Sequence, residues 1–180
     1  LLFFTDKCQV YKTTAADFDD TKASVLGDYL PAKLGMDSGE NPVFMAVTTD
    51  YQGYLLFAFE NGKCAKVELS GYATKTNRRK LTGAYCDKSP LVSVIELPQE
   101  EELALYASDG RTLIFSTALL APKTTRATQG VAVMALKKNA KIVRVQALSD
   151  SAIGNQARYR AKSLPAASAA GGYGGAANLT

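Results

Sequence analysis

The sequence predicts an all-β fold of tandem four-stranded antiparallel blades, each about 50 residues long, of which three are visible in the chain. A hairpin pattern occurs three times, and its turn positions Cys8, Gly62 and Gly110 are 54 and 48 residues apart. No segment shows the apolar period of a convincing amphipathic helix. Because such a repeat cannot bury its apolar face alone, we expect neighbouring copies to supply each other's core.

The second hairpin is the clearest of the three. Residues 54–59 and 64–69 are strand-like runs on either side of Asn61-Gly62. Asn-Gly in this setting favours a two-residue type I′ turn, which needs positive φ at both central positions. The third hairpin has Asp109-Gly110, whereas the first has Cys8 at the glycine position, so its turn can be of another type.

Each hairpin is followed by a polar loop, a glycine and a closing strand. The loop is 71–80 with Gly83 in the second copy and 121–126 with Gly130 in the third, and Gly27 corresponds in the first. The closing strands alternate in character and are rich in β-branched residues, as half-buried strands are. They are expected at 43–47, 91–95 and 142–145.

These patterns divide the chain into blades at approximately 1–49, 50–99 and 100–148. From 149 to 180 the pattern decays into a basic stretch and then an Ala-, Gly- and Ser-rich tail. The tail has too little bulky apolar surface to offset the entropy of ordering it, so we expect it to be largely disordered. Because the chain begins in mid-strand without Met, we expect a piece of a longer polypeptide.

Composition argues against several classes of protein. The longest apolar runs are far shorter than the roughly 18 residues of a membrane span. The chain has three cysteines, no C-x-x-C spacing and no His, so we expect no zinc site and no disulfide framework, and a reducing cytoplasm fits best. It has no nucleophile elbow and no Gly-rich phosphate loop, so no catalytic residues are expected. Consecutive acids at Glu100-Glu101-Glu102 lack metal-site geometry and are expected to form a solvated turn.

The charge is unevenly distributed along the chain, whose net charge is +4. The first 50 residues hold four Lys against eight acids, whereas 51–99 and 100–148 each hold seven bases against four acids. An acidic first third beside basic later parts produces a one-sided field that favours a polyanion.

Several of these features resemble one known family. Leu1–Lys7 followed by Val10-Tyr11-Lys12, the Asn-Gly and Asp-Gly hairpins, and the loops with Arg four residues before the closing glycine resemble the C-terminal domain of bacterial type IIA topoisomerase A subunits. The family comprises the DNA gyrase A subunit together with its topoisomerase IV counterpart. The resemblance covers roughly 1–148 and implies a β-pinwheel, a propeller-like arrangement of blades with duplex DNA bent around a basic outer rim.

The resemblance also implies a function. The fragment would be a DNA-binding and DNA-bending or wrapping module without catalytic residues, because the family's catalytic tyrosine lies in the preceding breakage-reunion region. The fragment itself would need no cofactor, while the parent enzyme would use ATP and Mg²⁺ through other domains and the B subunit of an A2B2 assembly. We expect a monomeric fragment with double-stranded DNA as partner, no membrane partner, and a cytoplasmic, nucleoid-associated location.

One departure from the family concerns gyrase. Its Gly-rich basic heptapeptide is not found, since Asn77-Arg78-Arg79-Lys80 is basic but lacks the glycines. This favours a relaxing or decatenating parent enzyme over a supercoiling one. The alternative function for the whole chain is a propeller-like protein-interaction module without a DNA role.

Phosphate contact by wrapping needs cations along a curved surface and no base-reading helix. The basic loops lie where the family presents its rim, and the strand lysines after two hairpins occupy matching positions. For each of them the alternative is a solvated cation or a residue that discourages edge pairing. The DNA-binding candidates are Lys75, Arg78, Arg79 and Lys80, then Lys123 and Arg126, then Lys12 and Lys66. Two alternatives remain for the basic stretch after the last blade, a flexible electrostatic arm or an ordinary solvated tail. Its cations are Arg158, Arg160 and Lys162.

Overall fold

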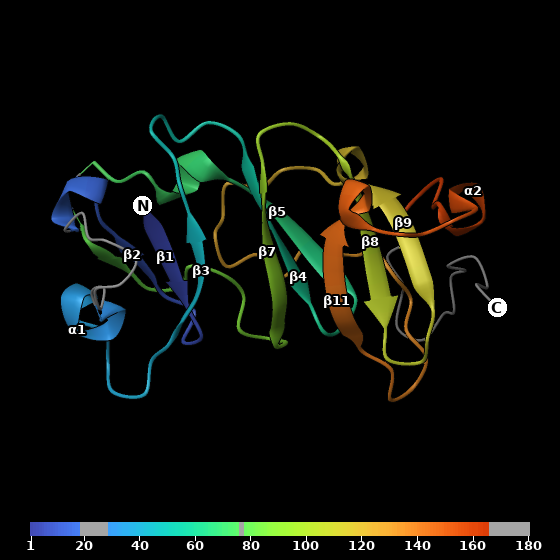
Figure 1. The fold of residues 1–180 in the computed structure, drawn as a ribbon, viewed down its shortest axis with the longest axis horizontal. Helices are drawn as coiled ribbons and strands as arrows, with labels where there is room; N and C mark the ends of the chain where they lie inside the picture. The colour runs from blue at the N-terminus through green and yellow to red at the C-terminus, as the bar shows by residue number, and fades with distance from the viewer. Residues whose placement is uncertain (19–28, 76–77, 166–180) are drawn as a thin grey trace.

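The computed structural model describes residues 1–18, 29–75 and 78–165, and these form three antiparallel sheets arranged side by side (Figure 1). The all-β, bladed fold class is therefore confirmed.

The first sheet has the order β3-β1-β2-β6, the second β10-β5-β4-β7 and the third β11-β8-β9. The strands of the first sheet are β1 Leu2–Thr5, β2 Val10–Lys12, β3 Pro42–Ala46 and β6 Lys80–Leu81. Those of the second are β4 Tyr54–Phe59, β5 Lys63–Glu68, β7 Leu91–Leu97 and β10 Val131–Ala132. Those of the third are β8 Glu102–Ala107, β9 Thr112–Ser116 and β11 Ile142–Ala147.

Sequence repeats and sheets do not coincide. The fourth strand of the first sheet, β6, comes from the second repeat and pairs with β2. The fourth strand of the second sheet, β10, comes from the third repeat and pairs with β5. A strand from each later repeat thus completes the sheet of the preceding repeat. These two pairings cross the expected blade boundaries at 49/50 and 99/100. Periodicity marks the length of a repeat, whereas pairing is decided by which edge has unpaired N–H and C=O groups within reach.

The hairpin turns differ from the predicted type I′ turn. Gly62 has a φ of 83°, but Asn61 is not among the described residues with positive φ. The N–H of Gly62 donates to the carbonyl of Phe59 at 3.2 Å, and Asn61 Oδ1 accepts from the N–H of Lys63 at 3.0 Å. This is the longer hairpin loop in which one left-handed residue follows the turn. Cys8, with a φ of 56°, adopts the same left-handed region, so the first turn keeps this conformation without glycine.

Two apolar layers hold the sheets together. Leu55 and Phe57 of β4 lie in a layer with Phe4 of the first sheet, while Leu56 on the same strand lies in a layer with Leu105 of the third. Successive side chains of a strand point to opposite faces of its sheet. The second sheet is therefore buried on both faces, which explains why 54–59 is almost continuously apolar and does not alternate.

The outer face of the first sheet is covered by chain that precedes β3. The ring of Phe3 lies 5.9 Å from that of Phe18. Glu40 is buried, and its carboxylate accepts hydrogen bonds from Thr5 Oγ1 at 2.7 Å and from the Tyr11 hydroxyl at 2.6 Å. Burial and the hydrogen bond to Glu40 raise the pKa of Tyr11.

The remaining regular elements are short helical turns. They are η1 Ala15–Asp17, α1 Leu30–Leu34, η2 Leu69–Tyr72, η3 Thr117–Leu119, η4 Leu148–Asp150 and α2 Gln156–Tyr159. Within the described residues no helix has the length and apolar character needed to cross a membrane.

The first part of the predicted 149–180 tail packs against the fold. Tyr159, Ala161 and Leu164 pack against the apolar layer of the third sheet, so 149–165 lies against the fold. The remainder of the predicted tail, 166–180, lies outside the described residues, as does Gly27 of the first repeat.

Gly130→Ala should destabilise the protein more than Gly83→Ala, although both glycines close a basic loop and both have left-handed φ, 71° and 58°. A Cβ on Gly130 would lie 2.1 Å from the Cys64 carbonyl oxygen, whereas a Cβ on Gly83 would meet nothing within 4 Å. We expect losses of about 3 kcal/mol or more and of about 1 kcal/mol respectively, measured by urea unfolding. Equal losses would contradict the close approach of Gly130 to β5.

Candidate nucleic-acid interface

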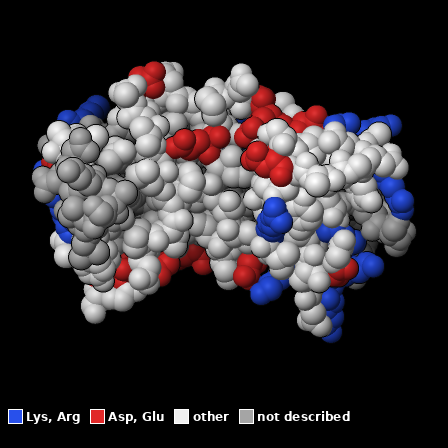
Figure 2. Space-filling view, viewed as in Figure 1, with Lys and Arg blue, Asp and Glu red and all other residues white. Residues whose placement is uncertain are grey.

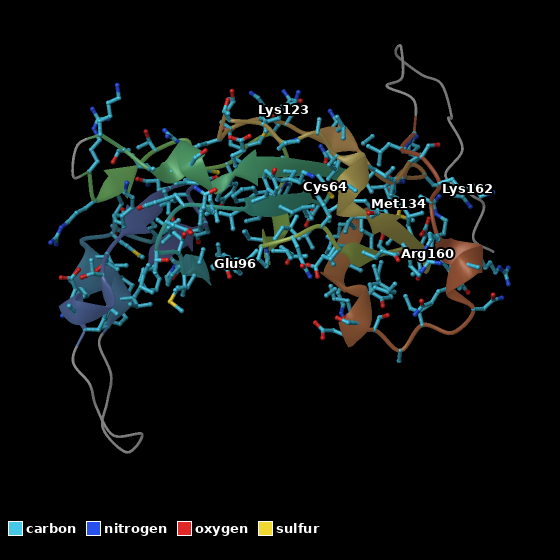
Figure 3. All side chains as sticks on the ribbon, turned by 90° about the horizontal axis from the view of Figure 1, so that it is seen from above. Cys64, Glu96, Lys123, Met134, Arg160 and Lys162 are labelled. Carbon is cyan, nitrogen blue, oxygen red and sulfur yellow. The ribbon has the colours of Figure 1, made fainter. Side chains whose placement is uncertain are left out.

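The two predicted basic loops lie beside each other in the fold. In Figure 3 the described parts of the second repeat's loop, 71–75 and 78–80, and the segment containing Lys123 run along one edge, and Glu96 lies away from it. Lys123 forms an isolated parallel bridge with Val67 of β5. Its N–H donates to the carbonyl of Lys66 at 2.8 Å, and its carbonyl accepts from the N–H of Glu68 at 2.9 Å. The third repeat's loop is therefore fixed to the second sheet by its backbone, and the side chain of Lys123 is exposed.

Two backbone carbonyls at the end of η2 accept hydrogen bonds from cations of two other repeats. Lys12 Nζ donates to the carbonyl of Tyr72 at 2.8 Å and to Thr74 Oγ1 at 2.9 Å. Arg126 Nη1 donates to the carbonyl of Gly71 at 2.9 Å. The last carbonyls of a helical turn lack partners within the turn, and cations there satisfy them. Lys12 and Arg126 thus act as anchors for the segment that follows η2.

Gly71 permits this arrangement because its missing side chain leaves room for the incoming loop. A Cβ on Gly71 would lie 2.9 Å from the carbonyl oxygen of Thr124 and 3.7 Å from Cγ of Arg126. Nε of Arg126 is buried and has no hydrogen-bond partner among the described residues. Burial first, and then the nearby Arg126 charge, lower the pKa of Lys12. Two cations are therefore held close together here.

A cavity of about 490 Å³ opens beside these anchors. Its lining combines Lys12, Lys75 and Arg79 with hydroxyl and carboxylate groups, among them Tyr51 and Asp17. The hydrogen bond from the Thr13 hydroxyl, then that from the Thr14 N–H, lower the pKa of Asp17 to about 2. The carboxylate is thus anionic at neutral pH, and its charge partly balances the cations around it.

The second loop presents its remaining cations to solvent. Arg78 and Arg79 are exposed, and the carbonyl of Arg79 accepts from the N–H of Lys12 at 2.6 Å. Lys80 pairs with Asp37 at 3.2 Å and lies over the ring of Tyr11 at 5.7 Å from its centroid. The loop backbone is anchored while Arg78 and Arg79 point outward, which is an arrangement suited to binding an anion.

The prediction that Lys66 contacts DNA is wrong. Its side chain is only 2% exposed, and its Nζ lies 2.6 Å from Glu100 and 3.0 Å from the carbonyl of Thr117. The ammonium also lies 5.0 Å from the centroid of the Tyr54 ring. Because it faces the junction of the second and third sheets, it cannot contact an outside phosphate. Glu100 likewise serves this buried pair and does not belong to a merely solvated turn.

Of the eight candidates, the structure buries one, Lys66, and leaves the other seven half-buried or exposed. Sequence reasoning missed the groups that line the cavity between them, Tyr51 and Asp17. For Asp17 a signal exists, since it stands three residues after Thr14 at the start of η1, and its carboxylate accepts from the N–H of Thr14 at 3.0 Å, as the third residue of a capping box does. For Tyr51 we find no local signal, because its neighbours come from other repeats.

The charge pattern on the face in Figure 2 agrees with the expected asymmetry only at its basic end. Asp and Glu gather near the middle of this face, and Lys and Arg lie toward its ends, most of them at the third sheet. Among the described residues no group of three or more His, Cys, Asp or Glu could hold a metal ion. The three cysteines are free.

Lys66→Met should lower the free energy of unfolding by about 2 kcal/mol at pH 7, because it leaves a partly buried carboxylate without its ion pair. Lys63→Met, a change at a partly exposed position of the same strand, should stay within about 0.5 kcal/mol. Affinity for any polyanion should be unchanged in both. A loss of affinity in Lys66→Met with normal stability would return Lys66 to the binding surface.

The difference between wild type and Lys66→Met should also depend on pH. Burial alone would raise the pKa of Glu100, but the hydrogen bonds from Lys66 and Thr117 lower it below its ordinary value of 4.5. A lowered folded-state pKa stabilises above the unfolded value, and this stabilisation is lost as the pH falls through the folded value. Urea unfolding at a series of pH values should therefore show the difference narrowing below pH 4.5.

Comparisons with known proteins give matches to this chain in sequence and in fold. No protein-family model matches the chain. The DNA gyrase A subunit of Mycoplasma pneumoniae is 27% identical over 132 residues, which are 73% of this chain and 16% of that protein. The crystal structure of the C-terminal domain of DNA topoisomerase IV has a TM-score of 0.70 and 29% identity, and the match covers 82% of this chain and 46% of that one.

Two further structures show the same fold at lower identity. The DNA gyrase A C-terminal domain has a TM-score of 0.56 with 19% identity over 81% of this chain and 46% of its own. The E. coli ParC C-terminal domain has a TM-score of 0.61 with 15% identity over 82% of this chain and 61% of its own. The chain therefore spans less than two thirds of each relative. In sequence and in fold, it matches part of the β-pinwheel C-terminal domain found in topoisomerase IV and in the A subunit of DNA gyrase.

Proposed function

We propose that this chain is a module that binds duplex DNA and bends or wraps it for the A subunit of a type IIA topoisomerase. The observation that supports this most is the convergence of basic side chains from three repeats on one edge. Lys12 and Arg126 anchor consecutive carbonyls of the second repeat, and Arg79 follows in the same segment. Similarity to the C-terminal domains of topoisomerase IV and gyrase A points in the same direction.

The geometry favours phosphate contact without base reading. The described residues form no helix long enough to enter a major groove, since α1 and α2 have five and four residues. Cations on successive sheets instead follow the curved outer edge, where a bent duplex can lie. Because each neutralised phosphate releases counterions, affinity should fall steeply with salt and depend little on sequence.

The anchoring contacts reduce the cost of binding. Lys12 and Arg126 hold the backbone that presents Arg78 and Arg79, so less conformational entropy is lost when these arginines meet phosphates. DNA contact is thereby assigned to Lys75, Arg78, Arg79, Lys80 and Lys123, with Lys12 and Arg126 as supporting cations.

In this proposal the module itself supplies no catalytic group. Double-strand passage, ATP hydrolysis and Mg²⁺ binding belong to the parent enzyme's other domains and to the B subunit of an A2B2 assembly. None of the nine Tyr is assigned a role in DNA cleavage. The site of action would be the bacterial nucleoid in the cytoplasm.

The experiment is a titration of the purified chain against long duplexes of two unrelated sequences at rising salt. We expect similar affinities for both and a linear fall of log affinity with log salt. Energy transfer between dyes at the two ends of a duplex should rise on binding if the DNA is bent. Failure to bind at low salt would leave the protein-interaction module as the better function.

Arg78→Glu/Arg79→Glu should weaken binding to every duplex by roughly tenfold and reduce the salt slope by about two. The matched control is Lys137→Glu/Lys138→Glu, which reverses two adjacent exposed cations at the opposite end of the sheets, near the turn residue Asp109. The control should change affinity much less. Equal effects of the two variants would mean that net charge, and not the proposed edge, determines binding.

A further inference from the structure

In all three hairpins the same position of the second strand contacts a segment from later in the chain, which pairs antiparallel in the first sheet and parallel in the second and third. Each has one left-handed residue in its turn, Cys8, Gly62 or Gly110, with φ values of 56°, 83° and 87°. The fourth residue after it lies on the second strand of the hairpin in each sheet. These residues are Lys12 in β2, Lys66 in β5 and Ile114 in β9.

The backbone of each of these residues is hydrogen-bonded to the incoming segment. In the first sheet its N–H donates to the carbonyl of Arg79 at 2.6 Å. In the second its carbonyl accepts from the N–H of Lys123 at 2.8 Å, and in the third from the N–H of Ala161 at 2.7 Å. Parallel bridges accompany the last two contacts, between Val67 and Lys123 and between Ile114 and Arg160.

The third incoming segment does not come from a repeat. It is the C-terminal stretch 151–165, which includes α2 and packs Tyr159, Ala161 and Leu164 against the third sheet. On the third sheet it occupies the place that the basic loop of the next repeat occupies on the second. The stretch for which the sequence left open a flexible arm or a solvated tail thus packs on the third sheet.

Like the two loops, this stretch is basic. Arg160 pairs with Glu102 at 2.5 Å and so fixes the segment to β8. Arg158 and Lys162 on either side of it are exposed. In Figure 3 Lys162 lies at the end of the molecule formed by the third sheet, and Lys123 lies on the edge over the second. The incoming segments therefore form a row of three, one on each sheet.

We propose that the segment 158–162 is the third phosphate-binding segment of this row, with Arg158 and Lys162 contacting the DNA backbone and Arg160 acting as the anchor. This rests on the proposed DNA-binding function and extends it to the third sheet. A duplex following the outer edge would meet cations at 78–80, then at 123–126, then at 158–162. The surface that contacts DNA thus extends over one more sheet than the basic loops of the repeats reach.

The segment also covers apolar surface of the third sheet, so deleting it would test stability and binding together. Reversal of the exposed cations avoids this. Arg158→Glu/Lys162→Glu in the full chain should keep the wild-type thermal unfolding temperature within a few degrees. It should weaken binding of a duplex of about 60 base pairs roughly tenfold and lower the salt slope by about two.

Two variants measured beside it make the result decisive. Arg78→Glu/Arg79→Glu reports on the proposed function itself, and Lys137→Glu/Lys138→Glu carries the same change in net charge at the opposite end of the sheets. If Arg78→Glu/Arg79→Glu loses affinity while Arg158→Glu/Lys162→Glu keeps it or matches the control, the third segment is overturned and DNA binding stands. If neither variant differs from the control, the proposed function itself fails.

A duplex-length series gives an independent readout. With three segments in use, affinity should keep rising until the duplex is long enough to reach all three. In Arg158→Glu/Lys162→Glu this rise should stop at a shorter length. An unchanged length dependence would overturn the role of the third segment.

Discussion

Every sheet in this chain depends on chain supplied from outside its own hairpin. The second sheet buries both faces of β4, with Leu55 and Leu56 entering different apolar layers. Its outer strand β5 is completed by β10 and by Lys123 of the third repeat. An edge strand with unpaired N–H and C=O groups invites pairing with other molecules, and strand exchange between repeats removes that edge. The same exchange makes the stability of each sheet inseparable from that of its neighbour.

This constraint also positions the charges. The segments that cross to the preceding sheet are the basic loops, so backbone pairing fixes the place where their side chains emerge. Arg79 is held through its carbonyl by Lys12, and Lys123 by its N–H on Lys66. The spacing of cations along the edge therefore follows the spacing of the sheets.

Two corresponding positions show how context decides the role of a residue. Lys12 and Lys66 both stand four residues after a left-handed turn residue, yet Lys12 anchors a carbonyl at the outer edge while Lys66 is buried in an ion pair with Glu100. The difference arises from what packs against each strand: η2 lies beside Lys12, and the third sheet covers Lys66. The two lysines share their position in the hairpin, although the residues around them differ. The neighbouring element determines whether the ammonium meets a backbone carbonyl or a carboxylate.

The sequence by itself determined the features that depend on near neighbours: the three hairpins, their 50-residue spacing, the strand character of each run and the basic nature of the loops. It predicted the wrong turn type, because Asn61 and Gly62 are compatible with more than one loop length. Tertiary structure alone decided which sheet each fourth strand joins, which lysine is buried, and that residues 151–165 complete the third sheet. These outcomes depend on backbone and side-chain partners such as Lys12 with Tyr72, or Ala161 with Ile114, which are far apart in sequence. No periodicity encodes such pairs, since they arise only once the sheets have packed.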